Sequence, residues 1–268
     1  MKFIRLATIA ALSTTILAGG ATAAFAQEVR DVTTEGQVEF RSAGEEDGEL
    51  EVLPPETDPD VEIDPEVPGT TGPLSIVKAA TMNFGTQVIS NQDETYNMVA
   101  EMARLANPEA DGPTEVPYIS FAQVQDVRGT NAGWDLQVSL SDFTSNTQNN
   151  VLTGAEIEFV GSRIQYEGTN TDNAPSAHAD GLKLSPTTGA QSVMTAAQGQ
   201  GAGASSVIWG DQSDLMAQFE DEDIEVVENG AIQLSIPGST AKDATTYTST
   251  LSWELTSTPD EDGPEVDA

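Results

Sequence analysis

The stretch Trp134-Asp135-Leu136-Gln137-Val138-Ser139-Leu140 decides the fold, because apolar and polar side chains alternate along its whole length. Successive residues of a β-strand project to opposite faces of a sheet, so this alternation predicts a half-buried strand with one apolar face. Residues 247–255 follow a similar pattern near the end of the chain. Its apolar face is formed by Tyr247, Leu251, Trp253 and Leu255.

Other short runs of the same kind lie between these two and before them, separated by clusters of Gly, Pro, Asn and Asp. They span residues 74–78, 84–90, 118–126, 155–160, 182–184, 206–209, 224–227 and 231–236. Many short strands joined by polar turns predict an all-β domain over residues 73–259, an antiparallel β-sandwich. Within it, apolar residues at helical spacing predict one short helix over 96–106, and the small residues of 195–206 predict a flexible loop.

The N-terminus has the pattern of a secretory signal peptide over residues 1–26. Lys2 and Arg5 precede an apolar run over residues 6–17, and Ala24-Phe25-Ala26 supplies a small-residue cleavage site. The apolar run is shorter than the roughly 20 residues that a membrane span needs. We therefore expect secretion without direct membrane insertion.

Charge and composition exclude several classes of function. The chain has 44 Asp+Glu against 10 Lys+Arg, a formal net charge of −34, one His and no Cys. Nucleic acids are bound largely through Lys and Arg, so they are not expected partners. Disulfides and thiolate metal sites are impossible, and we expect neither a metal nor another cofactor. Residues 27–72, acidic and interrupted by prolines, predict a disordered linker, and residues 260–268 predict an acidic tail.

Two motifs that suggest catalysis are weak. Ser239-Thr240-Ala241-Lys242 fits the S-x-x-K pattern of a serine nucleophile, but the companion S-D-N and K-T-G motifs are absent. His178 lies among small residues and is expected to be an exposed loop histidine. The alternative is a metal or general-base site with Asp172 or Asp180. No carboxylate pair is singled out for glycoside hydrolysis, so we do not expect an enzyme.

Two W-x-L triplets, Trp134-Asp135-Leu136 and Trp253-Glu254-Leu255, stand out in this setting. They are accompanied by Leu74-Ser75-Ile76, by Asn83-Phe84-Gly85-Thr86-Gln87 and by the run that leads from Val124 to Trp134. With these segments the chain resembles the WxL-domain surface proteins of low-G+C Gram-positive bacteria over essentially all of residues 73–259. The acidic N-terminal segment is also similar to that of short members of the family.

The resemblance implies a secreted protein attached non-covalently to the bacterial cell wall, with peptidoglycan or another cell-wall polymer as the ligand. It also implies a surface complex with a membrane-anchored surface protein and a larger WxL protein of the same gene cluster. An adhesin for host matrix or for another surface protein is the alternative, and a wall-sugar hydrolase is the least favoured.

The W-x-L residues allow two physical interpretations. Trp134, Leu136, Trp253 and Leu255 form either a ligand platform, because indole faces suit sugars, or part of the core, with Tyr247 and Leu251 in support. We predict that the two triplets lie close together on adjacent strands, as a shared platform requires. Arg128 is one of few cations in the domain, and Asp126 is its expected ion-pair partner. Contact of Arg128 with a ligand carboxylate or phosphate is the alternative.

Overall fold

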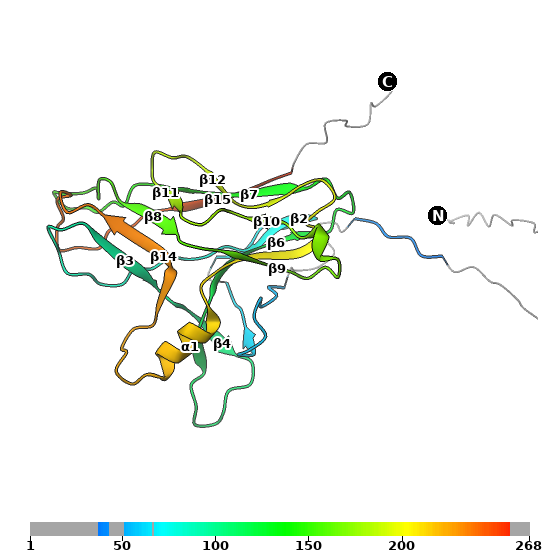
Figure 1. The fold of residues 1–268 in the computed structure, drawn as a ribbon, viewed down its shortest axis with the longest axis horizontal. Helices are drawn as coiled ribbons and strands as arrows, with labels where there is room; N and C mark the ends of the chain where they lie inside the picture. The colour runs from blue at the N-terminus through cyan, green and yellow to red at the C-terminus, as the bar shows by residue number, and fades with distance from the viewer. Residues whose placement is uncertain (1–36, 43–50, 66, 258–268) are drawn as a thin grey trace, which may run out of the picture. The chain divides into compact units, whose positions relative to one another are not determined.

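A computed structural model describes residues 37–42, 51–65 and 67–257 of the chain. The chain divides into two compact units, Met1–Glu39 and Phe40–Ala268, and the fold below is that of the second. The predicted signal peptide and acidic tail lie outside the described residues. Figure 1 shows the order of the elements along the chain.

The strands of the second unit form four sheets, and every strand pair is antiparallel. The first sheet contains β1 (Val61–Glu62), β4 (Glu101–Leu105) and β5 (Glu115–Tyr118), in that order. The second contains β10 (Ser176–Ala177), β12 (Gln191–Ala196), β7 (Trp134–Leu140) and β15 (Leu251–Ser257). The third contains β11 (Leu182–Leu184), β8 (Glu156–Phe159), β14 (Glu228–Ile236) and β3 (Glu94–Val99). The fourth contains β2 (Leu74–Lys78), β6 (Ser120–Asp126), β13 (Gly203–Trp209) and β9 (Arg163–Tyr166).

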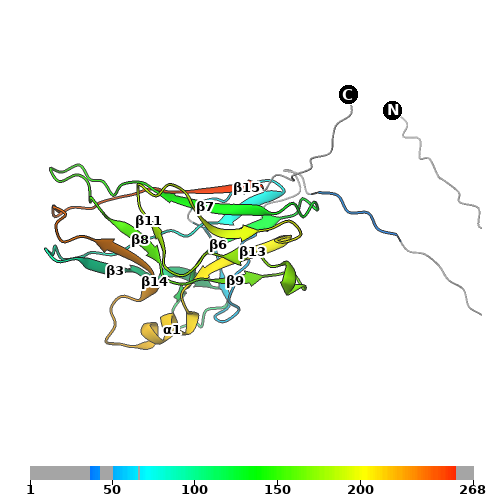
Figure 2. The same cartoon turned by 45° about the horizontal axis from the view of Figure 1, so that its top comes forward.

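The expectation of an all-β, antiparallel fold is confirmed. The strands are distributed over four sheets rather than the two of a simple sandwich. The second, third and fourth sheets share one apolar core, and Figure 2 shows β7 and β15 side by side along one margin of the fold. Strands β6 and β13 of the fourth sheet are buried on both faces, because Phe121 and Ile208 belong to a second core against the first sheet.

The predicted helix over residues 96–106 is wrong. This region forms β3 and β4, which pair in different sheets, and Met102 on the supposed apolar face is 52% exposed. Strand pairing therefore overrides the helical spacing of the apolar residues. Residues 84–90 and 224–227 are not strands either. The α-helix that does form is α1 (Gln212–Glu220), where Asp211 caps the first turn by accepting from the Ser213 and Asp214 amides.

Within the described part of the predicted linker, residues 51–65 differ from the disordered segment that we expected. Val52 and Val61 are buried in the second core, and β1 pairs with β4. The Gln123 side chain accepts from the Leu53 amide at 3.0 Å and donates to the Leu53 carbonyl at 2.8 Å. A few well-spaced apolar residues and satisfied backbone groups thus order a stretch whose composition suggested a spacer.

Candidate functional site: the W-x-L sheet

The two W-x-L triplets lie on neighbouring strands, as predicted. β7 and β15 pair so that Leu136 is opposite Leu255, and Trp253 is opposite Val138. Residues directly opposite each other on paired strands project from the same face of the sheet. Both triplets therefore turn their Trp and Leu side chains toward the shared core.

Trp134 is part of the core. Its side chain is fully buried, and its indole N–H donates to the Gly201 carbonyl at 3.1 Å. Gly201 has a φ of 74°, and a Cβ there would lie 2.6 Å from the Trp134 Nε1 atom. Only a glycine suits that position, which fixes the loop between β12 and β13 against the indole. The full burial of Trp134 and Leu136 favours the core-packing interpretation for the first triplet.

Trp253 lies at the margin of the core, because β15 is an edge strand of its sheet. Its ring is half-buried, and its centroid is 6.3 Å from that of Trp209. Trp209 is fully buried and stacks on Phe159 with ring centroids 4.6 Å apart. The second triplet is thus joined to an aromatic cluster of Trp209, Phe159 and His178 that sequence reasoning missed.

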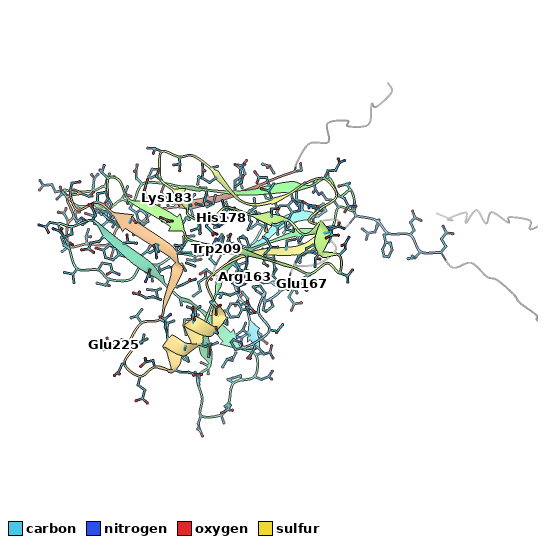
Figure 3. All side chains as sticks on the ribbon, in the orientation of Figure 1. Arg163, Glu167, His178, Lys183, Trp209 and Glu225 are labelled. Carbon is cyan, nitrogen blue, oxygen red and sulfur yellow. The ribbon has the colours of Figure 1, made fainter. Side chains whose placement is uncertain are left out.

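His178 is not the exposed loop histidine that we expected. The Trp209 indole N–H donates to His178 Nε2 at 2.9 Å, and Figure 3 shows the two residues side by side. His178 Nδ1 lies 2.7 Å from the Ala179 carbonyl, so Nδ1 carries the proton and Nε2 accepts. Burial lowers the pKa of His178 from its ordinary value of 6.5, which favours this neutral form. The imidazole has a structural role, with both ring nitrogens engaged.

The predicted ion pair between Asp126 and Arg128 is confirmed. Arg128 donates from Nε to Asp126 Oδ1 at 2.9 Å and from a terminal nitrogen to Oδ2 at 2.7 Å. The same guanidinium donates to the Gly133 carbonyl at 2.9 Å. The Asp126 side chain is 2% exposed and that of Arg128 is 15% exposed. This bidentate pair holds the turn that leads into β7, immediately before Trp134.

Tyr247 and Leu251 anchor the beginning of β15. The Tyr247 hydroxyl donates to the Asn149 carbonyl at 2.6 Å and accepts from the Asp243 amide at 3.0 Å. Leu251 pairs opposite Leu140. Both residues also line an apolar cavity of about 870 Å³ at this end of the fold. Tyr247 and Leu251 therefore hold β15 in place, and they do not form a ligand surface together with the W-x-L tryptophans.

The opposite side of the W-x-L sheet carries polar side chains, and we call it the outer face. On β7, Asp135 accepts from Ser192 and from Thr195, both at 2.9 Å, and also from Gln137. The pairing register places further hydroxyl and carboxylate groups of β12, β7 and β15 beside them. The outer face comprises Asp135, Gln137, Ser139, Ser192, Thr195, Ser252, Glu254 and Thr256.

The S-x-x-K stretch does not assemble a nucleophile. Lys242 Nζ donates to three carbonyl groups, those of Ser90 and Pro237 at 3.2 Å and that of Thr240 at 3.1 Å. The ammonium group is thus held by carbonyl oxygens and is not bonded to the Ser239 hydroxyl. The geometry therefore gives Lys242 the role of a loop anchor.

Fold and site together define an all-β module built around two paired W-x-L strands. Residues 27–259 match the WxL family model, described as a WxL domain for surface cell wall binding, and the chain belongs to this family. The match begins at residue 27, the first residue of the acidic segment, whereas we expected the domain to start at residue 73. No curated protein and no solved structure matches the chain. Within the described ranges, no helix is both long and apolar enough to cross a membrane.

Proposed function

We propose that this protein is secreted and is held non-covalently on the bacterial cell wall, with peptidoglycan as its ligand. Membership of a cell wall-binding surface family supports the attachment. The signal-peptide pattern of residues 1–26 supports export. In this proposal the W-x-L residues shape the sheet, and a different surface of the same sheet contacts the wall.

The observation that carries the proposal is the composition of the outer face. It holds four serine or threonine residues on β12 and β15 and one on β7, together with an amide and the carboxylates Asp135 and Glu254. Peptidoglycan presents hydroxyl and acetamide groups, which pair with such side chains through hydrogen bonds. Because Asp135 and Glu254 make this face negative, hydrogen bonds rather than charge attraction must carry its contact with an anionic wall.

The surface complex implied by the resemblance is part of the same proposal. A wall-bound module of this size has room for a second contact, since the outer face uses one side of one sheet. We propose that a membrane-anchored surface protein or a larger WxL protein occupies another part of the molecule.

Co-sedimentation with purified peptidoglycan tests the proposed function. The chain from residue 27 to residue 268 is expected to pellet with peptidoglycan and to be released by soluble peptidoglycan fragments. Cellulose is the matched insoluble control, and fluorescently labelled peptidoglycan reports any hydrolysis. Equal pelleting with cellulose would overturn the wall-binding proposal, and release of labelled fragments would favour a hydrolase.

A further inference from the structure

A groove at one end of the fold lies beside the beginning of β15. The segment 82–91 forms one side and the segment 243–249 forms the other. Its apolar part has a volume of about 870 Å³. An adjoining part of about 810 Å³ shares residues 87–89 and Tyr96 with it. We call these two parts the end groove.

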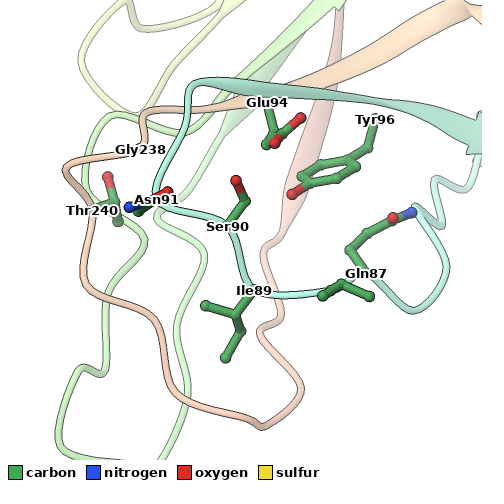
Figure 4. A pocket seen from close by; sticks show the side chains of 9 residues that line it. Gln87, Ile89, Ser90, Asn91, Glu94, Tyr96, Gly238 and Thr240 are labelled. Carbon is green, nitrogen blue, oxygen red and sulfur yellow. The ribbon is translucent and has the colours of Figure 1, made fainter.

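The floor of the end groove is apolar and is built from well-held residues. Phe84, Phe143 and Leu152 are buried core residues that also line the cavity. The Tyr96 ring projects from β3 across the adjoining part, toward the side where Ser90 lies (Figure 4). The Tyr247 hydroxyl is occupied by Asn149 and Asp243, so it contributes mainly its ring. Such a lining offers hydrophobic contact more than hydrogen bonds.

The lip of the groove exposes large apolar side chains. Val88 is 87% exposed and Ile89 is 54% exposed, and they are consecutive residues on the same segment. Adjacent exposed apolar residues beside an apolar cavity are typical of a surface that a partner covers. The lip and the floor therefore form one continuous hydrophobic surface.

The charges around the groove are mostly negative. The Glu94 carboxylate projects beside Tyr96 and Ser90 in Figure 4, and Asp243 lines the apolar part. Hydrogen bonds from the Asn149 amide and side chain lower the pKa of Asp243, which therefore stays charged in mild acid. The cation near the rim, Lys242, is held by three carbonyl groups. This arrangement favours an occupant that carries positive charge.

We infer that the end groove binds an extended segment of a partner protein that carries apolar side chains flanked by lysine or arginine. The inference rests on the proposed surface complex and identifies the end groove as the surface that the partner protein contacts. The apolar lining and lip match the side chains of such a segment, and Glu94 with Asp243 matches its cations. A sugar chain fits less well, because the floor of the groove is formed by buried apolar side chains such as Phe84, Phe143 and Leu152.

Binding to an array of random octapeptides tests the inference with the chain from residue 27 to residue 268. The peptides that bind are expected to be enriched in apolar residues together with Lys or Arg. The double variant Val88→Ser/Ile89→Ser should weaken binding of the enriched peptides at least tenfold. Glu94→Gln should weaken it several-fold and reduce its salt dependence. Val226→Ser, which changes another exposed valine, is the matched control and should bind normally.

Three outcomes would overturn the inference. They are the absence of enriched peptides, enrichment of acidic peptides, and equal binding by the double variant and the Val226→Ser control. Self-association that is lost in the double variant would assign the groove to a second copy and would also overturn it. Pelleting with peptidoglycan is measured on the same proteins, and the double variant should retain it. If neither the wild type nor any variant pellets with peptidoglycan, the proposed wall attachment is refuted, and the peptide-binding result is unaffected.

Discussion

Trp134 and Trp253 carry the same motif in different surroundings. Trp134 is fully buried with its indole N–H bound to the Gly201 carbonyl, whereas Trp253 is half-buried on an edge strand. A buried aromatic side chain with a satisfied N–H contributes both packing and a hydrogen bond. At the scale of single residues, the two triplets therefore differ in how much stability they provide.

Replacing each tryptophan by phenylalanine measures this difference. Trp134→Phe leaves the buried Gly201 carbonyl without its donor and removes part of a packed ring, so it should cost about 2 kcal/mol of unfolding free energy. Trp253→Phe should cost less than about 1 kcal/mol, because its ring is only half-buried. Urea unfolding of both variants checks the values. Equal losses of unfolding free energy in the two variants would show that the different burial of Trp134 and Trp253 does not determine their contributions to stability.

His178 predicts a pH dependence of stability. Burial lowers its folded-state pKa below the ordinary 6.5, so the folded state binds fewer protons than the unfolded state in this range. The stability is fully present above about pH 6.5 and is lost as pH falls through the folded-state value. Protonation of Nε2 also opposes the donor of Trp209. The Asp180 carboxylate counteracts the effect, since it favours the charged imidazole.

His178→Gln isolates this effect, because the glutamine oxygen accepts from Trp209 but does not titrate. Between pH 7.5 and pH 5.5 the wild-type melting temperature should fall relative to that of the variant. Taking the difference between the two proteins removes the contribution of the many carboxylates. If the melting temperatures of the wild type and the variant change equally with pH, the role assigned to His178 is contradicted.

At the scale of elements, the sequence pattern locates strands well where one face is clearly apolar. Residues 74–78, 134–140 and 182–184 were predicted with the observed bounds of β2, β7 and β11. Helix α1 was missed because Gln212 and Leu215 are its buried residues, which gives it almost no apolar stripe. The strands β3 and β4 were missed because their apolar residues happen to recur at helical spacing.

The candidate site was predictable only in part. Pairing of the triplets and of Asp126 with Arg128 followed from their positions along the sequence. The contact of His178 with Trp209 joins residues 31 positions apart, the first just after β10 and the second at the end of β13, so no local pattern indicates it. The outer face likewise depends on the register of β12 against β7, which the sequence does not display.

The segment 51–65 is held by side chains of the first and fourth sheets, and this predicts the effect of Tyr118→Phe. The Tyr118 hydroxyl donates to the Glu56 carbonyl and accepts from the Glu56 amide, both at 2.8 Å. Burial raises the pKa of Tyr118 to about 12, so the hydroxyl keeps its proton at neutral pH. The variant should lose about 1 kcal/mol and should speed amide hydrogen exchange in residues 53–62.

Tyr166→Phe is the matched control for this measurement. Its hydroxyl donates to the Ala202 carbonyl at 2.9 Å, at a different part of the domain. The control should leave hydrogen exchange in residues 53–62 unchanged. If exchange in residues 53–62 is as slow in Tyr118→Phe as in the control, the segment is held by its apolar contacts alone.

At the scale of the whole molecule, the formal net charge of −34 governs how the protein approaches an anionic wall. Salt screens repulsion between exposed charges, and acid protonates carboxylates whose ordinary pKa is near 4. Wall retention should therefore be stronger at pH 4.5 than at pH 8, and stronger at higher ionic strength. Pelleting with purified walls measures both, and tighter binding at pH 8 would contradict the expectation.

The central claim is that the outer face of the W-x-L sheet contacts the wall while the tryptophans hold the sheet from inside. The most direct test is the affinity for purified peptidoglycan of the variant Gln137→Ala/Ser252→Ala/Thr256→Ala. Its control is Thr95→Ala/Gln165→Ala, which removes exposed polar groups from the other sheets. The outer-face variant is expected to bind peptidoglycan at least tenfold more weakly than the wild type while its free energy of unfolding is unchanged. The control is expected to bind with wild-type affinity. Wild-type affinity in the outer-face variant would contradict the account.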